Sequence, residues 1–314
     1  MGAYLLKRLL LLLPTAIVPV LLVFFMLQLA PGDPAAVLLG ENATPQQVAE
    51  LRAELGLDEP LLAQFIAFCG NLLTLDLGNS LFLGEPVLGS VLAYGVITAQ
   101  LTLLALLIAV VLGASAGILA ALYHNRVVDK MTMLVAVLGV AIPEFWLALL
   151  LILGFAVTFR WFPVSGYTPA SDGLLDSLQS LTLPALALGL IQAAFIARMT
   201  RSAVLDVLGE QFIATARAKG LGARAVIGRH VVRAASVPIV TVVGLTMAVL
   251  LGGAIAVETI FSLPGIGRLL VQAVSRRDYP LIQGIVLVVA VAYVLINLLV
   301  DVVYAIIDPR VRYQ

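Results

Sequence analysis

Charged side chains are scarce in this sequence. Only 11% of its 314 residues are Asp, Glu, Lys or Arg, whereas 62% are hydrophobic, and the mean hydropathy is +1.11. A soluble domain carries about 25% charged residues, so the charge here is too sparse to cover a soluble protein of this size. The formal net charge is zero, which excludes a chain-wide field that would attract nucleic acid as a partner. The composition indicates a polytopic membrane protein.

Cysteine, histidine and the motifs of common enzymes are also rare or missing. Cys69 is the only cysteine, which excludes an internal disulfide, and His124 and His230 are too far apart in sequence to suggest a metal site. The chain has no G-x-x-x-x-G-K-[ST] phosphate loop, no H-E-x-x-H, no G-x-S-x-G and no C-x-x-C. We therefore expect no enzyme activity and no cofactor or metal ion in this chain. The functions that remain possible are passage of a solute across the membrane and a structural role in it.

Long hydrophobic runs are what the sequence has instead. Six are long enough to cross a bilayer, and because backbone groups in lipid must be hydrogen-bonded internally, each is predicted to be a helix. If the N-terminus is cytoplasmic, 13 of the 18 Lys and Arg residues lie in cytoplasmic segments, which fits the positive-inside rule with both termini inside. The first run is too long for a signal peptide and is interpreted as a retained span. The predicted spans are residues 9–29, 97–122, 131–159, 181–197, 236–257 and 282–306.

The predicted outer segment between the first two spans, residues 31–96, is too long for a simple loop. Thr44 is a predicted N-cap, with Pro45 at the first helical position and Gln47 closing a capping box. Gly56 can end that helix, and Asp58 is a predicted cap for a second helix. We expect a small folded cap with helices.

Polar residues inside the predicted spans are few. Glu144 follows Pro143, where the third span is expected to tilt or kink, and Asp301 lies near the end of the sixth. A carboxylate inside the bilayer is costly, so Glu144 either lines a solute path or gate, or is neutral or paired beside the kink. Asp301 is interpreted as a pairing group. Gln100 and Gln192, in the second and fourth spans, could each face a path or hold helices together.

The longest predicted cytoplasmic segment, residues 198–235, contains a run of positive charge. It includes the stretch ATARAKGLGARAVIGRHVVR, which holds five Lys and Arg residues and no acidic one. Topology explains the sign of this charge but not the pattern around it. A break at Gly220 separates a first helix, with Phe212, Ile213 and Ala216 close to one face, from a second helix that leads into the fifth span. The pattern predicts a protrusion onto which a soluble partner docks, with a solvated loop as the alternative.

The segment FIATARAKGLGARAVIGRHVVRAASVPIV resembles the cytoplasmic EAA loop of permease subunits of binding-protein-dependent ABC importers. In that family the loop forms the coupling helix, which sits in a groove of the ATPase subunit. The absence of Glu from the motif's opening and the long distance from Gly220 to Pro238 are similar to the peptide and nickel branch. IPEFWLALLLI, FSLPGIGRLLVQAVSRRDYPLIQG and NLLVDVVYAIIDPRVRY are similar to the DppB-type permeases of that branch, and the resemblance covers essentially the whole chain. The coupling residues that it implies are Ala214, Thr215, Ala216, Arg217, Lys219, Gly220 and Leu221.

The resemblance implies an all-α membrane protein with the type I ABC importer permease fold. It implies six transmembrane helices, with the N- and C-termini in the cytoplasm of a bacterial cell. The expected boundaries are a first transmembrane helix at 1–30, an extracytoplasmic helical segment at 31–96, a five-helix core at 97–306 with the coupling loop at 198–235, and a cytoplasmic tail at 307–314.

The resemblance also implies partners and a transport mechanism. A second, DppC-like permease would complete the pathway, two ATP-binding subunits similar to DppD and DppF would hold ATP and Mg²⁺, and an extracytoplasmic binding protein would deliver the solute. That protein is expected to dock at Pro264, Gly265, Arg277 and Asp278. The expected cargo is dipeptides or oligopeptides; the same machinery with nickel, a metal chelate or glutathione is the alternative. An ion-coupled secondary transporter is the alternative from a different class.

Overall fold

The computed structural model describes residues 17–26, 28, 34–39, 43–54 and 56–307. Most of these residues lie in helices, and the isolated bridge between Asn79 and Pro86 belongs to no strand in the described part of the chain. Four described helices are long and apolar enough to cross a membrane, and a bent pair would make a fifth. The predicted first span lies partly outside the described residues, which include a short helix at Ile17–Met26 from it.

The chain divides into two units. One comprises Val96–Arg268 together with the segment from Ile296 onward, and the other comprises the described residues up to Gly95 together with Leu269–Leu295. Three helices belong partly to each unit: α5 (Val87–Leu122), α12 (Ile266–Ser275) and α13 (Tyr279–Ile307).

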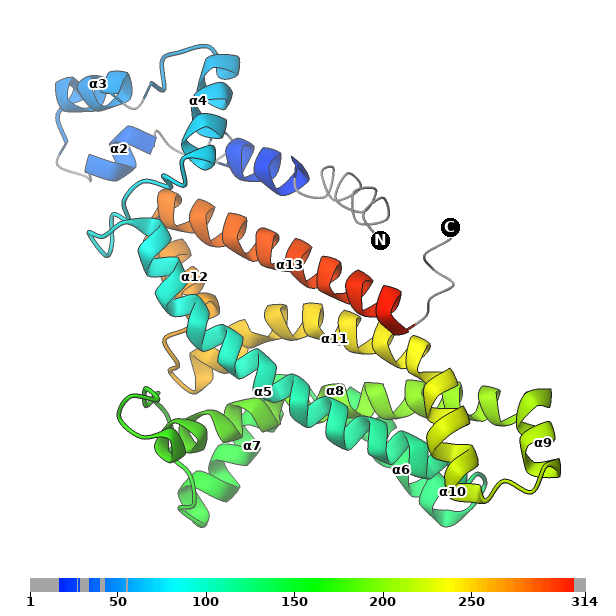
Figure 1. The fold of residues 1–314 in the computed structure, drawn as a ribbon. Helices are drawn as coiled ribbons and strands as arrows, with labels where there is room; N and C mark the ends of the chain where they lie inside the picture. Colours follow the sequence, from blue (N-terminus) through cyan, green and yellow to red (C-terminus); the bar gives the residue numbers. More distant parts are fainter. Residues whose placement is uncertain (1–16, 27, 29–33, 40–42, 55, 308–314) are drawn as a thin grey trace. The chain divides into compact units, whose positions relative to one another are not determined.

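Helix α8 (Leu174–Leu208) is the centre of the first unit (Figure 1). It packs against α6, α7 and α11, and most of its apolar stretch is buried. Glycines bring α5 and α8 close together: a Cβ on Gly117 of α5 would lie 2.5 Å from the Ala197 carbonyl oxygen, and one on Gly189 of α8 would lie 2.8 Å from that of Ala105. Small residues at such contacts let two helix backbones approach within the bilayer. The helix extends well beyond its predicted range of 181–197.

The predicted third span is broken rather than kinked. Helix α6 (Val127–Ala141) and helix α7 (Glu144–Leu151) meet at an angle of 104°, and α7 continues into a π-helix, η1 (Ile152–Thr158). Pro143 has no N–H to continue the helix, and it forces the residue before it, Ile142, into extended backbone with φ −82° and ψ 124°. The tilt or kink expected over 131–159 is therefore a complete interruption.

The helices after α8 form the rest of the first unit. Helix α9 (Gln211–Ala218) is followed by α10 (Ala223–Ala225), η2 (Val226–Val231) and α11 (Val232–Ile260), of which the last three form one continuous helix of 38 residues. The second helix of the basic segment therefore continues into the predicted fifth span without a break, as expected.

The second unit contains α2 (Pro34–Leu39), α3 (Pro45–Glu54), α4 (Leu61–Leu73) and the described parts of its longer helices. The capping box at α3 is confirmed: Gln47 N–H donates to Thr44 Oγ1 at 3.3 Å, and Thr44 N–H donates to Gln47 Oε1 at 2.9 Å. Gly56 adopts φ +66° after α3, as expected of a residue that ends a helix. The predicted Asp58 cap is wrong, because α4 begins after Pro60 and Asp58 instead accepts a hydrogen bond from Arg52 Nε at 3.0 Å.

Candidate functional site

Helix α9 and the turn after it form a protrusion at the end of α8 that is remote from α7 (Figure 1). After α9, Gly220 takes φ +80°, its N–H donates to the Arg217 carbonyl at 2.9 Å, and Leu221 N–H donates to the Ala216 carbonyl at 3.4 Å. No described atom lies within 4 Å of where a Cβ on Gly220 would be. Glycine is needed here for its left-handed backbone, not for lack of space.

The inner face of this protrusion packs on the chain itself. Ile213 and Ala216 are buried against Val226 and Val231 of the following helix, together with residues of α8. Ala216, expected in the docking surface, is only 7% exposed. This expectation is corrected, because a short amphipathic helix has one apolar face, and α9 uses it to attach to its own unit.

The outer face of the protrusion combines apolar and positively charged side chains. Phe212 is 45% exposed and Leu221 is 41% exposed. Arg217 and Lys219 are exposed beside them. Such a surface suits a partner groove that is partly apolar and partly acidic. The exposed members of the predicted coupling set are Ala214, Thr215, Arg217, Lys219, Gly220 and Leu221.

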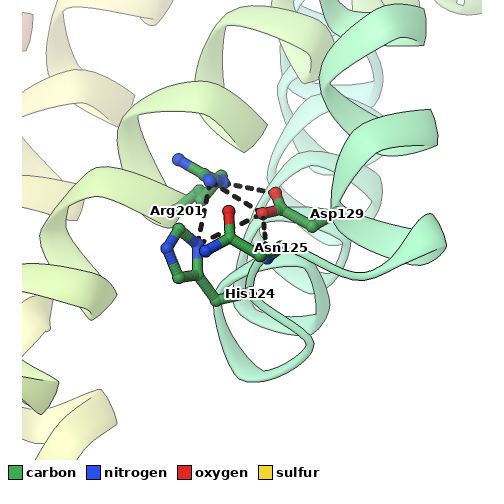
Figure 2. A network of polar contacts seen from close by, with 4 residues as sticks. All are labelled: His124, Asn125, Asp129 and Arg201. Atoms are coloured by element: carbon green, nitrogen blue, oxygen red, sulfur yellow. Dashed lines mark hydrogen bonds and ion pairs between the residues drawn. The ribbon is translucent and has the colours of Figure 1, made fainter.

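A polar network holds the turn between α5 and α6 to α8 (Figure 2). Arg201 of α8 binds Asp129 of α6 with two hydrogen bonds, from Nε to Oδ1 at 2.5 Å and from Nη2 to Oδ2 at 2.8 Å. His124 Nδ1 lies 3.1 Å from Arg201 Nη2 and 3.2 Å from Asp129 Oδ2, and Asn125 N–H donates to Asp129 Oδ2 at 2.9 Å. Asp129 is buried, and its carboxylate accepts hydrogen bonds on both oxygens.

The network accounts for the left-handed backbone of Asn125 and lies near the end of α8 that leads to α9. Asn125 adopts φ +62°, a conformation that Asn tolerates better than most residues, and this directs its N–H at the carboxylate. Arg201 lies about two helical turns before the end of α8, where the chain turns toward α9. This pair is not recognisable in the sequence, because its members are 72 residues apart and no local pattern links them.

The polar residues predicted for a path lie in three different environments. Glu144 begins α7 directly after the Pro143 break, and its Oε2 lies 2.8 Å from where a Cβ on Gly253 of α11 would be. The Tyr167 hydroxyl donates to Gln100 Oε1 at 2.9 Å, and Gln192 is buried in α8. None of the three lines the apolar groove of about 510 Å³ between α5, α6 and α8. No hydrogen bond or ion pair joins the three side chains within the described part of the chain, so they do not form one polar cluster there.

The residues predicted to receive a binding protein differ in exposure. Arg277 is exposed with φ +55°, and Pro264 is half-buried. Asp278 is fully buried: its carboxylate accepts hydrogen bonds from Ser80 Oγ at 2.6 Å, Phe82 N–H at 2.9 Å and Leu281 N–H at 3.1 Å. Its expected surface role is corrected, because these bonds make it a cap of α13 and an anchor for the loop between α4 and α5. Gly265 is buried as well.

Gly265 is buried against Glu258, a residue that sequence analysis missed. The fifth span is predicted to end at residue 257, directly before Glu258. Glu258 is therefore not among the carboxylates that the sequence places inside the spans. The side chain is 0% exposed in the structure. An acidic residue shortly before a Pro-Gly turn was the signal in the sequence. Among the described residues there is no group of three or more His, Cys, Asp or Glu side chains that could hold a metal ion.

Comparisons with known proteins agree with this arrangement. Residues 113–313 match the model of the family described as binding-protein-dependent transport system inner membrane component, and residues 1–94 match that of its N-terminal region. The chain is 43% identical to the dipeptide transport system permease protein DppB of Alkalihalophilus pseudofirmus over 100% of both chains. It is also 43% identical to the glutathione transport system permease protein GsiC of Escherichia coli O6:H1 over 99% of both chains.

Solved structures show the fold. A chain of the MetNI methionine ABC transporter in an inward-facing conformation matches with a TM-score of 0.56 at 20% identity, covering 69% of this chain and 96% of that one. A chain of an amino acid ABC transporter matches with a TM-score of 0.53 at 18% identity, covering 68% and 92%. The helical architecture is thus that of ABC transporter membrane subunits.

The protein is therefore a permease subunit of an ABC importer and a multi-pass protein of the inner membrane. It is not the catalytic part of its system, since ATP is hydrolysed by partner ATPase subunits. A system of this kind in general contains a partner permease, ATPase subunits and a substrate-binding protein. With full-length relatives and a family model that covers most of its length, this chain belongs to the family of binding-protein-dependent transport system inner membrane components.

Proposed function

We propose that this chain is the DppB-type permease of an importer for dipeptides or oligopeptides. The support is the 43% identity to a dipeptide permease over the full length of both chains. A relative named for glutathione, itself a small peptide, is equally similar, so glutathione is the second candidate cargo. Import of nickel or a metal chelate by the same machinery is the remaining alternative.

The observation that carries the ATP-driven part of the proposal is the outer face of the α9 protrusion. Phe212, Leu221, Arg217 and Lys219 form a mixed apolar and positive surface, while Ile213 fixes the helix to its own unit. A partner ATPase subunit seats this face in its groove. Closure of two such subunits on ATP and Mg²⁺ then moves α9, and the motion drives alternating access for a solute that an extracytoplasmic binding protein delivers.

The remaining parts of the proposal concern topology and assembly. The chain crosses the membrane six times with both termini in the cytoplasm, the first helix lying within 1–30 and the core within 97–306. Residues 31–96 are extracytoplasmic, 198–235 form the coupling loop, and 307–314 form a cytoplasmic tail. A DppC-like permease completes the pathway, and DppD- and DppF-like subunits bind the coupling loops. Pro264 in the first unit and Arg277 in the second are each a residue that the binding protein contacts.

The coupling surface is tested with a double variant, Phe212→Ala and Leu221→Ala, in the complete importer reconstituted in vesicles. Both side chains are exposed in the single chain, so their loss should not disturb its fold, but burial of such a side chain in a partner contributes about 1.5–3 kcal/mol. We expect at least tenfold weaker binding of the ATPase subunits and a matching loss of uptake. Val127→Ala, at a residue that is 74% exposed on α6, is the control. Unchanged ATPase binding by the double variant contradicts the assignment.

The cargo is tested by ligand identification on the cognate binding protein and by uptake into the same vesicles. ATP-dependent uptake of dipeptides supports the proposal, and uptake of glutathione or nickel alone selects an alternative. An ion-coupled transporter would instead continue uptake without the ATPase subunits and lose it with an ionophore.

A further inference from the structure

One continuous helix connects the coupling loop with the start of α12. It runs from Ala223 to Ile260, directly after the glycine turn, and its 38 residues correspond to a length of about 57 Å. Glu258 lies in the last turn of this helix, at the end remote from α9. A displacement of the coupling loop therefore reaches Glu258 through a single continuous helix.

The Glu258 carboxylate is hydrogen-bonded on both oxygens. Thr98 Oγ1 donates to Oε1 at 2.6 Å, and the backbone N–H of Arg268 donates to Oε2 at 3.1 Å. Ile266 N–H in turn donates to Thr98 Oγ1 at 2.8 Å. Two of the first three N–H groups of α12, which have no partner within their own helix, are thus satisfied by Glu258 and Thr98.

The loop between α11 and α12 is built around this side chain. A Cβ on Gly265 would collide with the Glu258 carboxylate, and a Cβ on Gly267 would lie 2.5 Å from Ile255 Cα. The loop is closed by two further bonds, from Leu263 N–H to the Glu258 carbonyl at 2.9 Å and from Arg268 Nη1 to the Ser262 carbonyl at 2.7 Å. A buried carboxylate surrounded this tightly has little freedom to move independently of α12.

We propose that Glu258, with Thr98, is a positioning residue that transmits motion of the coupling loop to the first turn of α12. The proposal rests on the proposed ATP-driven coupling through α9. When α11 moves, the carboxylate moves the start of α12 and the loop at 261–268 with it, so that the outer side of the permease responds to events at the ATPase. A carboxylate that only stabilised the fold would leave the yield of transport per ATP unchanged.

The test uses the complete importer in vesicles and the variant Thr98→Val, which keeps the shape of the side chain and removes the hydroxyl. We expect normal assembly and at least a fivefold fall in solute molecules imported per ATP hydrolysed. Thr98→Ser, which retains the hydroxyl, should restore the yield. Thr246→Val is the matched control, because Thr246 is also buried in the first unit and its hydroxyl has no hydrogen-bond partner among the described residues. Wild-type yield in Thr98→Val, or an equal loss in Thr246→Val, overturns the proposal.

Hydrogen exchange in the wild-type complex gives a readout that needs no variant. We expect the amides of Ile266 to Arg268 to change protection between the nucleotide-free and the ATP-trapped state. Unchanged protection overturns the proposal even if Thr98→Val fails to assemble. If the wild-type complex itself shows no ATP-driven uptake, the proposed function fails instead, so the two failures are distinguishable.

Discussion

The ion pair between Asp129 and Arg201 makes a quantitative prediction about stability. The perturbation is a double-mutant cycle of Asp129→Leu, Arg201→Met and the two together, since Leu and Met can fill the space with apolar atoms. The Asp129 side chain is 3% exposed and that of Arg201 is 23% exposed. Each single variant leaves its former partner as an unpaired charge in a largely buried position.

The magnitude follows from the difference in burial. Removing one member of a buried pair costs roughly 3–5 kcal/mol, and replacing both with apolar residues of similar volume is often close to neutral. We expect about 4 kcal/mol for Arg201→Met, which isolates the more buried charge, and about 3 kcal/mol for Asp129→Leu. The double variant should lose about 2 kcal/mol, mainly because Asn125 N–H loses its acceptor.

The assay is reversible unfolding in mixed micelles with an increasing fraction of denaturing detergent. The losses in unfolding free energy of the two single variants should add up to well above the loss of the double variant. The difference is a coupling free energy of at least 3 kcal/mol. His124→Ala is the internal control, because its side chain is 47% exposed and it should cost only about 0.5 kcal/mol. A coupling free energy below about 1 kcal/mol would refute the reasoning that burial makes this pair strong.

Three further predictions concern glycines and caps. Gly117→Ala should destabilise the protein by about 1–3 kcal/mol in the same unfolding assay, because its Cβ would lie 2.5 Å from a carbonyl oxygen of α8. Gly89→Ala in the same helix is the control: its Cβ would meet nothing within 4 Å, so this variant should stabilise the protein by up to about 1 kcal/mol. Gly220→Ala should destabilise the turn after α9 by about 1–2 kcal/mol through its φ of +80°, measured as faster tryptic cleavage there; an unchanged cleavage rate would argue against strain. Asp278→Ala should expose the amides of Phe82 and Leu281 to faster hydrogen exchange, and unaltered exchange would contradict its assignment as a cap.

The sequence was sufficient for features that depend on local chemistry. Long apolar windows predict the helices at 97–122, 236–257 and 282–306, because length and composition alone decide whether a segment can cross a bilayer. The capping box of Thr44 and Gln47 is equally local, since two side chains three residues apart satisfy each other's N–H groups. The helix, glycine turn and helix of the coupling loop also follow from residues that are neighbours in the chain.

Features that depend on packing between distant segments could not be predicted. The inward orientation of Ala216 depends on Val226 and Val231, whose arrangement is set only by the fold. The Glu258 carboxylate is stabilised by Thr98, 160 residues away, so nothing near it in sequence marks it as a buried cap. Asp278 gave the opposite error, because the resemblance that placed it in a docking surface does not show its bonds to Ser80 and Phe82, which are 198 and 196 residues away in sequence.

Helix α8 has a consequence for how the protein is made. It is the least hydrophobic of the four long helices, yet it is far more buried than α11, with which it packs. A helix whose side chains are suited to contact with protein partitions weakly into lipid. We therefore expect α8 to leave the insertion machinery slowly and to remain beside it until the helices that it packs against are made. Assembly of this permease should therefore be partly post-insertional, and a truncation before α11 should leave α8 recognisable to membrane quality-control proteases.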